Sequence, residues 1–199
     1  TEDHPNRHDT GIYHGMIRGG KAYRSDGTAV SEDIFQADAP LPAAFTRIFE
    51  GNRENVAWTS DIELDREGNP VIGFSVMKDA LPLASGKRGF DHRYYYARWD
   101  GTNWRTHEIA HAGTRLYPRE PEYTGLVALH PDDPDVVFIS ADVDPASGEP
   151  LLVEGERRYE IFRGTTADGG RTWPRPSRPR FRTRSPRHRC GCRRRCGPR

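Results

Sequence analysis

Residues 166–173, with the sequence TADGGRTW, decide which fold we expect for this chain. An Asp at the third position can accept hydrogen bonds from the backbone N–H groups of a tight turn, and Gly supplies the positive φ angles that such turns require. The Trp that closes the stretch can then pack between neighbouring β-sheets. The pattern therefore predicts a β-hairpin in which Asp168 and Trp173 have structural rather than catalytic roles.

Outward from this stretch, short β-type runs alternate with Gly, Asp, Asn and Pro residues. Strands are expected at 11–18, 21–24, 57–64, 70–77, 94–99, 104–109, 125–129, 136–140 and 159–163. Tight turns that suit hairpins are expected at 25–27, 66–69, 100–101 and 168–170. Helical periodicity is almost absent, and its best candidate is the short segment 31–39, which Pro40 ends. We therefore predict an all-β protein made of hairpins.

The Asp residues that begin the turns recur along the chain. Asp26, Asp65, Asp100 and Asp168 are separated by 39, 35 and 68 residues, the last gap being close to two of the shorter ones. A repeat of roughly 40 residues with four short strands is typical of a β-propeller blade. A chance set of hairpins in a β-sandwich is the alternative. The fold prediction is a partial β-propeller of about four blades over residues 1–173.

Charge separates the chain into a body and a tail. Of the 30 basic residues, 11 are Arg in residues 174–199, which hold no Asp or Glu, so the other 173 residues carry 19 basic and 29 acidic side chains. We expect the tail, 174–199, to be disordered, because it has too few apolar residues to offset its conformational entropy. Polyanion binding, or soft-metal binding by His188 with the three Cys residues, are alternatives. The favoured interpretation is out-of-frame translation of GC-rich DNA, and no function is assigned to this segment.

Composition excludes several classes. No run of about eighteen apolar residues exists, so no membrane-spanning helix is expected. All three Cys lie in the tail, at 190, 192 and 196, so the body has no disulfide framework and no thiolate metal site. The acidic body argues against a nucleic-acid partner. The chain starts at Thr1 with no signal peptide, and we expect it to be a fragment.

Several strings together resemble the Asp-box (BNR) repeat proteins that include the propeller-type ulvan lyases, and TADGGRTW matches the Asp-box pattern itself. They are TGIYHG at 10–15, SDGT at 25–28, DHRYYYARWDG at 91–101, EYTGL at 122–126, DDPDVVFISADVD at 132–144 and YEIFRG at 159–164. The resemblance implies a seven-bladed ring of which this chain forms a part. It also implies a secreted or periplasmic monomer that binds an anionic polysaccharide, with neither a membrane nor a nucleic acid as partner.

The chemistry implied by this resemblance is β-elimination on a uronate-containing, ulvan-type glycan, so the full-length protein is expected to be a carbon–oxygen lyase. A base removes the C5 proton beside the carboxylate, and the bond from C4 to the glycosidic oxygen breaks. The carboxylate charge must be neutralised by Arg, His, an amide or a metal, and a Tyr or His transfers the protons. No cofactor is predicted, although a structural or charge-neutralising metal ion is compatible with this chemistry.

The first residues carry side chains suited to this reaction. We predict that Arg7 neutralises the substrate carboxylate, with His4 as the alternative, and that His14 and Tyr13 transfer protons or contact the sugar. A solvated loop histidine is the alternative for His4. Tyr13 and His14 are adjacent in a strand, so they point to opposite faces and one of them can be a core residue.

A second group is expected to bind the substrate: His92, Arg93, Tyr95 and Tyr123. Arg93 suits bidentate contact with a sulfate or carboxylate. Alternation along the strand places Tyr94 and Tyr96 in the core and leaves Tyr95 to stack on a sugar ring. No metal site is expected at His107 and His111, because they lie four residues apart on a strand rather than on a helix.

Two other functions remain open. Asp boxes also occur in sialidases, so a sialidase-like glycoside hydrolase is one alternative, although its Arg triad and Tyr nucleophile are not evident in the sequence. A non-catalytic glycan-binding protein is the other.

Overall fold

The structure is a computed structural model, and it describes residues 10–36, 38–79 and 88–179. These residues form antiparallel β-sheets and one 3₁₀ turn, Pro42–Ala44, without an α-helix. The all-β prediction is confirmed, and so is each predicted strand, within a few residues at its ends. No helix in this part of the chain is long and apolar enough to cross a membrane.

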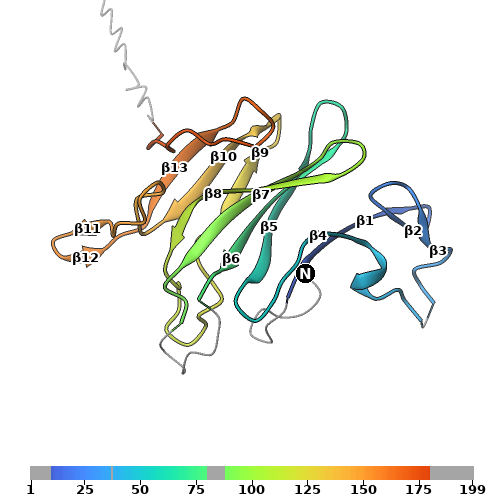
Figure 1. The fold of residues 1–199 in the computed structure, drawn as a ribbon, viewed down its shortest axis with the longest axis horizontal. Helices are drawn as coiled ribbons and strands as arrows, with labels where there is room; N and C mark the ends of the chain where they lie inside the picture. The colour runs from blue at the N-terminus through green and yellow to red at the C-terminus, as the bar shows by residue number, and fades with distance from the viewer. Residues whose placement is uncertain (1–9, 37, 80–87, 180–199) are drawn as a thin grey trace, which may run out of the picture.

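The middle sheet organises the fold (Figure 1). Its four strands pair in chain order: β5 (Val56–Leu64), β6 (Pro70–Met77), β7 (His92–Trp99) and β8 (Trp104–Gly113). Every residue of β6 after Pro70 is buried, whereas a strand with one solvated face would alternate between buried and exposed. The middle sheet is therefore covered on both faces.

The last sheet covers one face of the middle sheet. It consists of β9 (Val127–His130), β10 (Asp133–Ala141) and β13 (Glu160–Thr165), and the small hairpin β11 (Leu152–Val153) and β12 (Glu156–Arg157) lies between β10 and β13 in the chain. Tyr94 and Tyr96 are fully buried in the core that this contact forms, as predicted. Gly73 lies directly against Val127, and an added Cβ would meet Val127 Cγ1 at 3.1 Å.

The first sheet covers the other face. It contains β1 (Ile12–Arg18), β2 (Lys21–Arg24), β3 (Ala29–Ser31) and β4 (Thr46–Phe49), in the order β3-β2-β1-β4. Ile12 and Ile48 pack with Phe74 and Val76 of the middle sheet. The described residues thus form three stacked sheets and one small hairpin. This arrangement does not by itself confirm four propeller blades.

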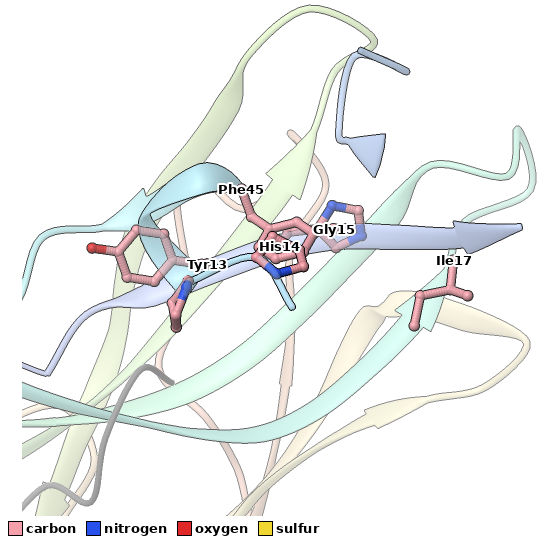
Figure 2. Close-up of a pocket in the computed structure, with 7 residues that line it drawn as sticks. Tyr13, His14, Gly15, Ile17 and Phe45 are labelled. Atoms are coloured by element: carbon pink, nitrogen blue, oxygen red, sulfur yellow. The ribbon is translucent and has the colours of Figure 1, made fainter. Parts of the chain in front are cut away.

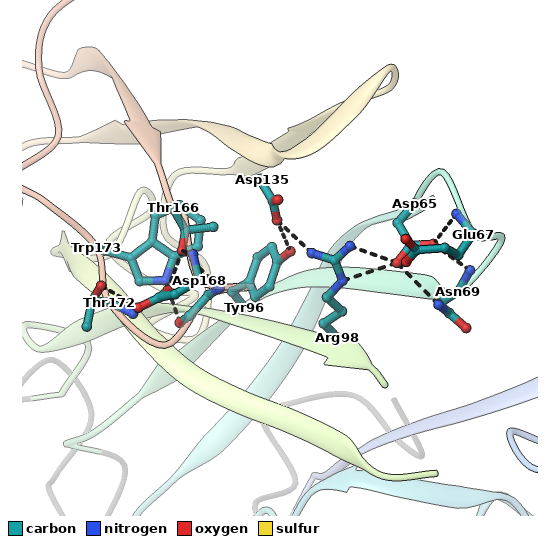
Figure 3. A network of polar contacts seen from close by, with 11 residues as sticks. Asp65, Glu67, Asn69, Tyr96, Arg98, Asp135, Thr166, Asp168, Thr172 and Trp173 are labelled. Atoms are coloured by element: carbon teal, nitrogen blue, oxygen red, sulfur yellow. Dashed lines mark hydrogen bonds and ion pairs between the residues drawn. The ribbon is translucent and has the colours of Figure 1, made fainter. Parts of the chain in front are cut away.

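The turn at 166–173 has the predicted construction (Figure 3). The backbone N–H of Thr172 donates to Asp168 Oδ1 at 3.0 Å, and the Thr172 hydroxyl donates to Asp168 Oδ2 at 2.6 Å. Trp173 meets Tyr96 edge to face, with ring centroids 5.2 Å apart. Gly170 has φ 92°, and a Cβ there would lie 2.4 Å from the Tyr96 ring, so both the turn and the packing require glycine.

The even spacing of the Asp turns has a different cause from the one predicted. The Asp65 turn joins β5 to β6, and the Asp100 turn joins β7 to β8, so both belong to one sheet. The gap of 35 residues between them is therefore the length of β6, β7 and the loop that joins them, and not a repeating unit. Asp100 and Asp168 are the comparable pair, since each follows the third strand of its sheet. The interpretation of all four turns as one repeat is wrong.

The best helical candidate is not a helix, in agreement with the all-β prediction, and the end of the body differs from the predicted boundary. The described residues of 31–39 form the end of β3 and turns rather than a helix. The packed body extends past Trp173, because Ser177 and Arg163 exchange two backbone hydrogen bonds, of 2.7 and 3.0 Å, at the open edge of β13. The predicted character of residues 180–199 lies outside the described residues.

Arg98 links the middle and last sheets through two carboxylates (Figure 3). Its Nη2 donates to Asp65 Oδ2 at 2.8 Å, and its Nη1 donates to Asp135 Oδ1 at 2.8 Å. The Tyr96 hydroxyl donates to the same Asp135 oxygen at 3.1 Å. Burial raises the pKa of Asp65, but the hydrogen bonds from Arg98 and Asn69 outweigh it, and the net shift is downward. Asp65 is therefore ionised at neutral pH and needs its cation.

We predict that Arg98→Met lowers the free energy of unfolding by about 3 kcal/mol, because it leaves the buried Asp65 carboxylate unpaired. The matched control is Arg105→Met, which removes an exposed ion pair with Asp100 and should cost less than about 1 kcal/mol. Urea unfolding followed by circular dichroism measures both. Equal losses for the two variants would contradict the role assigned to Arg98.

A second prediction concerns acid stability. The hydrogen bonds from Thr172 and Thr166 lower the pKa of Asp168 to about 2. A carboxyl with a depressed pKa in the folded state stabilises the fold above its unfolded value, and this stabilisation is lost as pH falls through the folded value. Melting temperatures should therefore fall between about pH 4 and pH 2, and Asp168→Asn should show a shallower fall. An NMR titration of the Asp168 carboxyl carbon that gives a pKa near 3.8 rather than about 2 would refute this prediction.

Candidate functional site

Two of the predicted catalytic residues, His4 and Arg7, lie outside the described residues. The other two, Tyr13 and His14, are on β1, which lies on the β5 side of the middle sheet (Figure 1). His14 is buried and Tyr13 is half-buried, which agrees with the prediction that alternation makes one of them a core residue.

Two surface hollows meet at these residues. One, of about 280 Å³, lies between β1 and the 3₁₀ turn and is shown in Figure 2. The other has the same volume and lies against β5 and β6. Both are lined by Tyr13, His14 and Gly15. Gly15 lets the Phe45 ring pack directly on β1, since an added Cβ would lie 2.3 Å from that ring.

The environment of His14 keeps its imidazole neutral. Burial lowers the pKa of His14 below its usual value. Its Nδ1 lies 2.8 Å from Ser25 Oγ, and the same oxygen accepts the indole N–H of Trp104 at 2.8 Å. The second lone pair of Ser25 Oγ can accept a hydrogen bond from an N–H at His14 Nδ1. The tautomer with its proton on Nδ1 leaves the Nε2 lone pair available as a base. Trp104 also touches the imidazole edge to face, with centroids 5.1 Å apart.

The arrangement around Arg93 differs from the predicted anion site. Its guanidinium donates to Asp91 at 2.6 Å and to Glu108 at 2.9 Å, and it lies 3.3 Å from His111 Nε2. Two carboxylates therefore already neutralise this cation, and a sulfate or carboxylate ligand would have to displace them. Sequence reasoning missed these partners because Glu108 and His111 come from the neighbouring strand β8.

Tyr95, His92 and Tyr123 do not form one surface with Arg93. The Tyr95 ring stacks on Phe74 with centroids 5.4 Å apart, so one of its faces is covered. His92 is 1% exposed, and its Nε2 lies 2.9 Å from the carbonyl oxygen of Pro121, which places it in the core. Tyr123 contacts the rings of Trp58 and Tyr117 edge to face. Of this group, the structure brings only Arg93 and Tyr95 together, through Glu108.

The part of the chain that the structure describes contains no candidate metal centre. No three of its His, Cys, Asp or Glu side chains lie together in a group that could hold a metal ion. Comparison of the chain with protein-family models, with curated proteins and with solved structures finds no match. The resemblance to Asp-box lyases therefore stays a prediction, and the candidate site rests on Tyr13, His14 and the side chains around them.

We predict that the His14 imidazole titrates below pH 6.5 in a proton–carbon NMR titration, with His14→Gln used to assign its signal. Because burial disfavours the charged imidazole, the folded state should lose stability as pH falls below the unfolded value of about 6.5. A His14 signal that titrates above that value would show that the ring is solvated or paired with an anion.

Proposed function

We propose that this chain acts in a polysaccharide lyase that cleaves uronate-containing, ulvan-type glycans by β-elimination, with His14 at the reacting sugar and Tyr13 in contact with the glycan chain. The observation that carries the proposal is the position of a neutral His and a Tyr where two hollows of about 280 Å³ meet. A glycan chain that spans both hollows meets both side chains.

In the proposed reaction, His14 Nε2 takes the C5 proton of the uronate, and the electron pair of that C–H bond forms the C4–C5 double bond. The C4–O4 bond breaks, and the protonated His14 gives the same proton to the leaving oxygen, so His14 is neutral again and no other reactant is consumed. Tyr13, on the opposite face of β1, contacts a neighbouring sugar of the glycan chain. Arg7 is the proposed cation for the substrate carboxylate, whose charge must be balanced as the carbanion develops.

For the fold, we propose that the stacked sheets are consecutive blades of a β-propeller. The chain-order pairing of the middle sheet and the comparable positions of the Asp100 and Asp168 turns support this. The first sheet departs from a simple blade, because β4 returns to pair with β1.

Non-catalytic glycan binding is the second candidate, and one observation favours it. Among the described residues that line the two hollows there is no Arg or Lys, and Asp61 adds a carboxylate. Elimination at this place therefore depends on a cation such as Arg7. A protein without that cation would bind a glycan and leave it intact.

We predict that the 199-residue chain incubated with ulvan produces ultraviolet absorbance from the new C4–C5 double bond. His14→Gln should lower kcat by roughly 10²–10⁴-fold, as expected for loss of an acid–base group, Tyr13→Phe should raise KM, and Arg7→Ala should lower kcat. Tyr23→Phe is the control, since Tyr23 is on the same sheet but does not line either hollow.

Each other outcome has a meaning. New reducing ends without absorbance would indicate hydrolysis, as in the sialidase-like alternative. Binding without either product would leave non-catalytic recognition. Full activity of His14→Gln would remove His14 from the mechanism, an unchanged KM for Tyr13→Phe would remove Tyr13 from the glycan contact, and unimpaired activity of Arg7→Ala would remove Arg7.

A further inference from the structure

A third hollow lies between the Asp26 turn of the first sheet and the Asp100 turn of the middle sheet. Its volume is about 310 Å³, and it shares no lining residue with the two hollows at Tyr13. Its lining includes Asp26, Arg47, Trp99, Asn103 and Trp104.

Two indole rings form a fixed corner of this hollow. The rings of Trp99 and Trp104 are 5.9 Å apart between centroids and inclined by 53°. Trp99 is buried and Trp104 is half-buried, with its N–H held by Ser25. Both rings are therefore immobilised before any ligand arrives, which reduces the entropic cost of binding. Trp104 is the more exposed of the two rings, and most of the remaining lining of the hollow is polar.

The polar groups around this corner are only partly used by the protein. Asp26 Oδ1 accepts the N–H of Thr28 at 2.9 Å, and the Thr28 hydroxyl also bonds to this exposed carboxylate, so its position at the rim of the hollow is fixed. The backbone of Asn103 closes the Asp100 turn, while its side-chain amide has no hydrogen bond to the described residues. Arg47 pairs with Glu50 at 3.2 Å, and both side chains are more than half exposed, so this pair is weak and easily exchanged.

From this geometry we infer that the third hollow binds one pyranose residue of an acidic glycan. The apolar face of the sugar ring lies against Trp104, which Trp99 supports from the core, its hydroxyls bond to Asp26 and Asn103, and its carboxylate or sulfate pairs with Arg47. The inference shares the glycan class with the proposed function, but it needs no elimination chemistry.

The hollow is connected to the candidate catalytic histidine. Trp104 forms part of the aromatic corner, and its indole N–H donates to the Ser25 oxygen that also bonds His14 Nδ1. Binding here positions the glycan chain on the first sheet, beside the two hollows at Tyr13.

The test is titration of the full 199-residue chain with ulvan tetrasaccharides, followed by tryptophan fluorescence and by calorimetry. Because Trp99 and Trp104 line the hollow, binding should change the emission. The double variant Asp26→Asn with Asn103→Ala should weaken binding by about tenfold or more, which corresponds to about 1.4 kcal/mol. Glu67→Gln is the matched control, since it removes one exposed carboxylate on a different turn and should bind as the unmodified chain does.

Unchanged affinity of the double variant, or no binding by the unmodified chain, would overturn the inference. If the double variant melts early, Asn103→Ala alone decides, because it keeps the backbone bonds of the turn. The two proposals fail separately. Binding at this hollow without any unsaturated product would refute elimination, whereas product formed at the normal rate and affinity by the double variant would refute the hollow.

Discussion

Burial of both faces of the middle sheet is the constraint on which the rest of the structure depends. Strand β6 has no solvated side from Val71 to Met77, so it is stable only when a further sheet lies on each face. The first sheet packs on the middle sheet through Ile12 of β1, and the last sheet packs on its other face through Val127 of β9. The candidate site follows from the first of these contacts, because it carries Tyr13 and His14 into place beside β5.

Polar side chains at the edges of the core fix the position of one sheet relative to the next. The Asp turns hold their own backbones, and Arg98 joins two of the layers because the carboxylates of Asp65 and Asp135 reach it from different elements. Ser25 has the same role between the first and middle sheets, since it bonds to both His14 and Trp104. A neutral, oriented histidine is thus a product of the contact between two sheets and not of β1 alone.

Several features of the site could be predicted because they depend on neighbours in the sequence. Alternation correctly placed Tyr94 and Tyr96 in the core and separated Tyr13 from His14. The fate of Arg93 and Tyr95 could not be predicted in this way, because their partners Glu108 and Phe74 lie on adjacent strands. His92 was expected at a surface, yet it is enclosed by residues that follow it by about thirty positions, such as Pro121.

The sequence by itself determined the all-β class, the strands and the construction of the Asp turns, because alternation and positive-φ glycines act within a few residues. Only the tertiary structure decided which turns share a sheet. The Asp65 and Asp100 turns belong to two hairpins of one sheet and are not the same turn in successive repeats. The tertiary structure alone joined Ser25 to Trp104, which are 79 residues apart in the chain. Such pairs depend on how sheets stack, and stacking is a property of whole apolar faces that no local pattern of residues records.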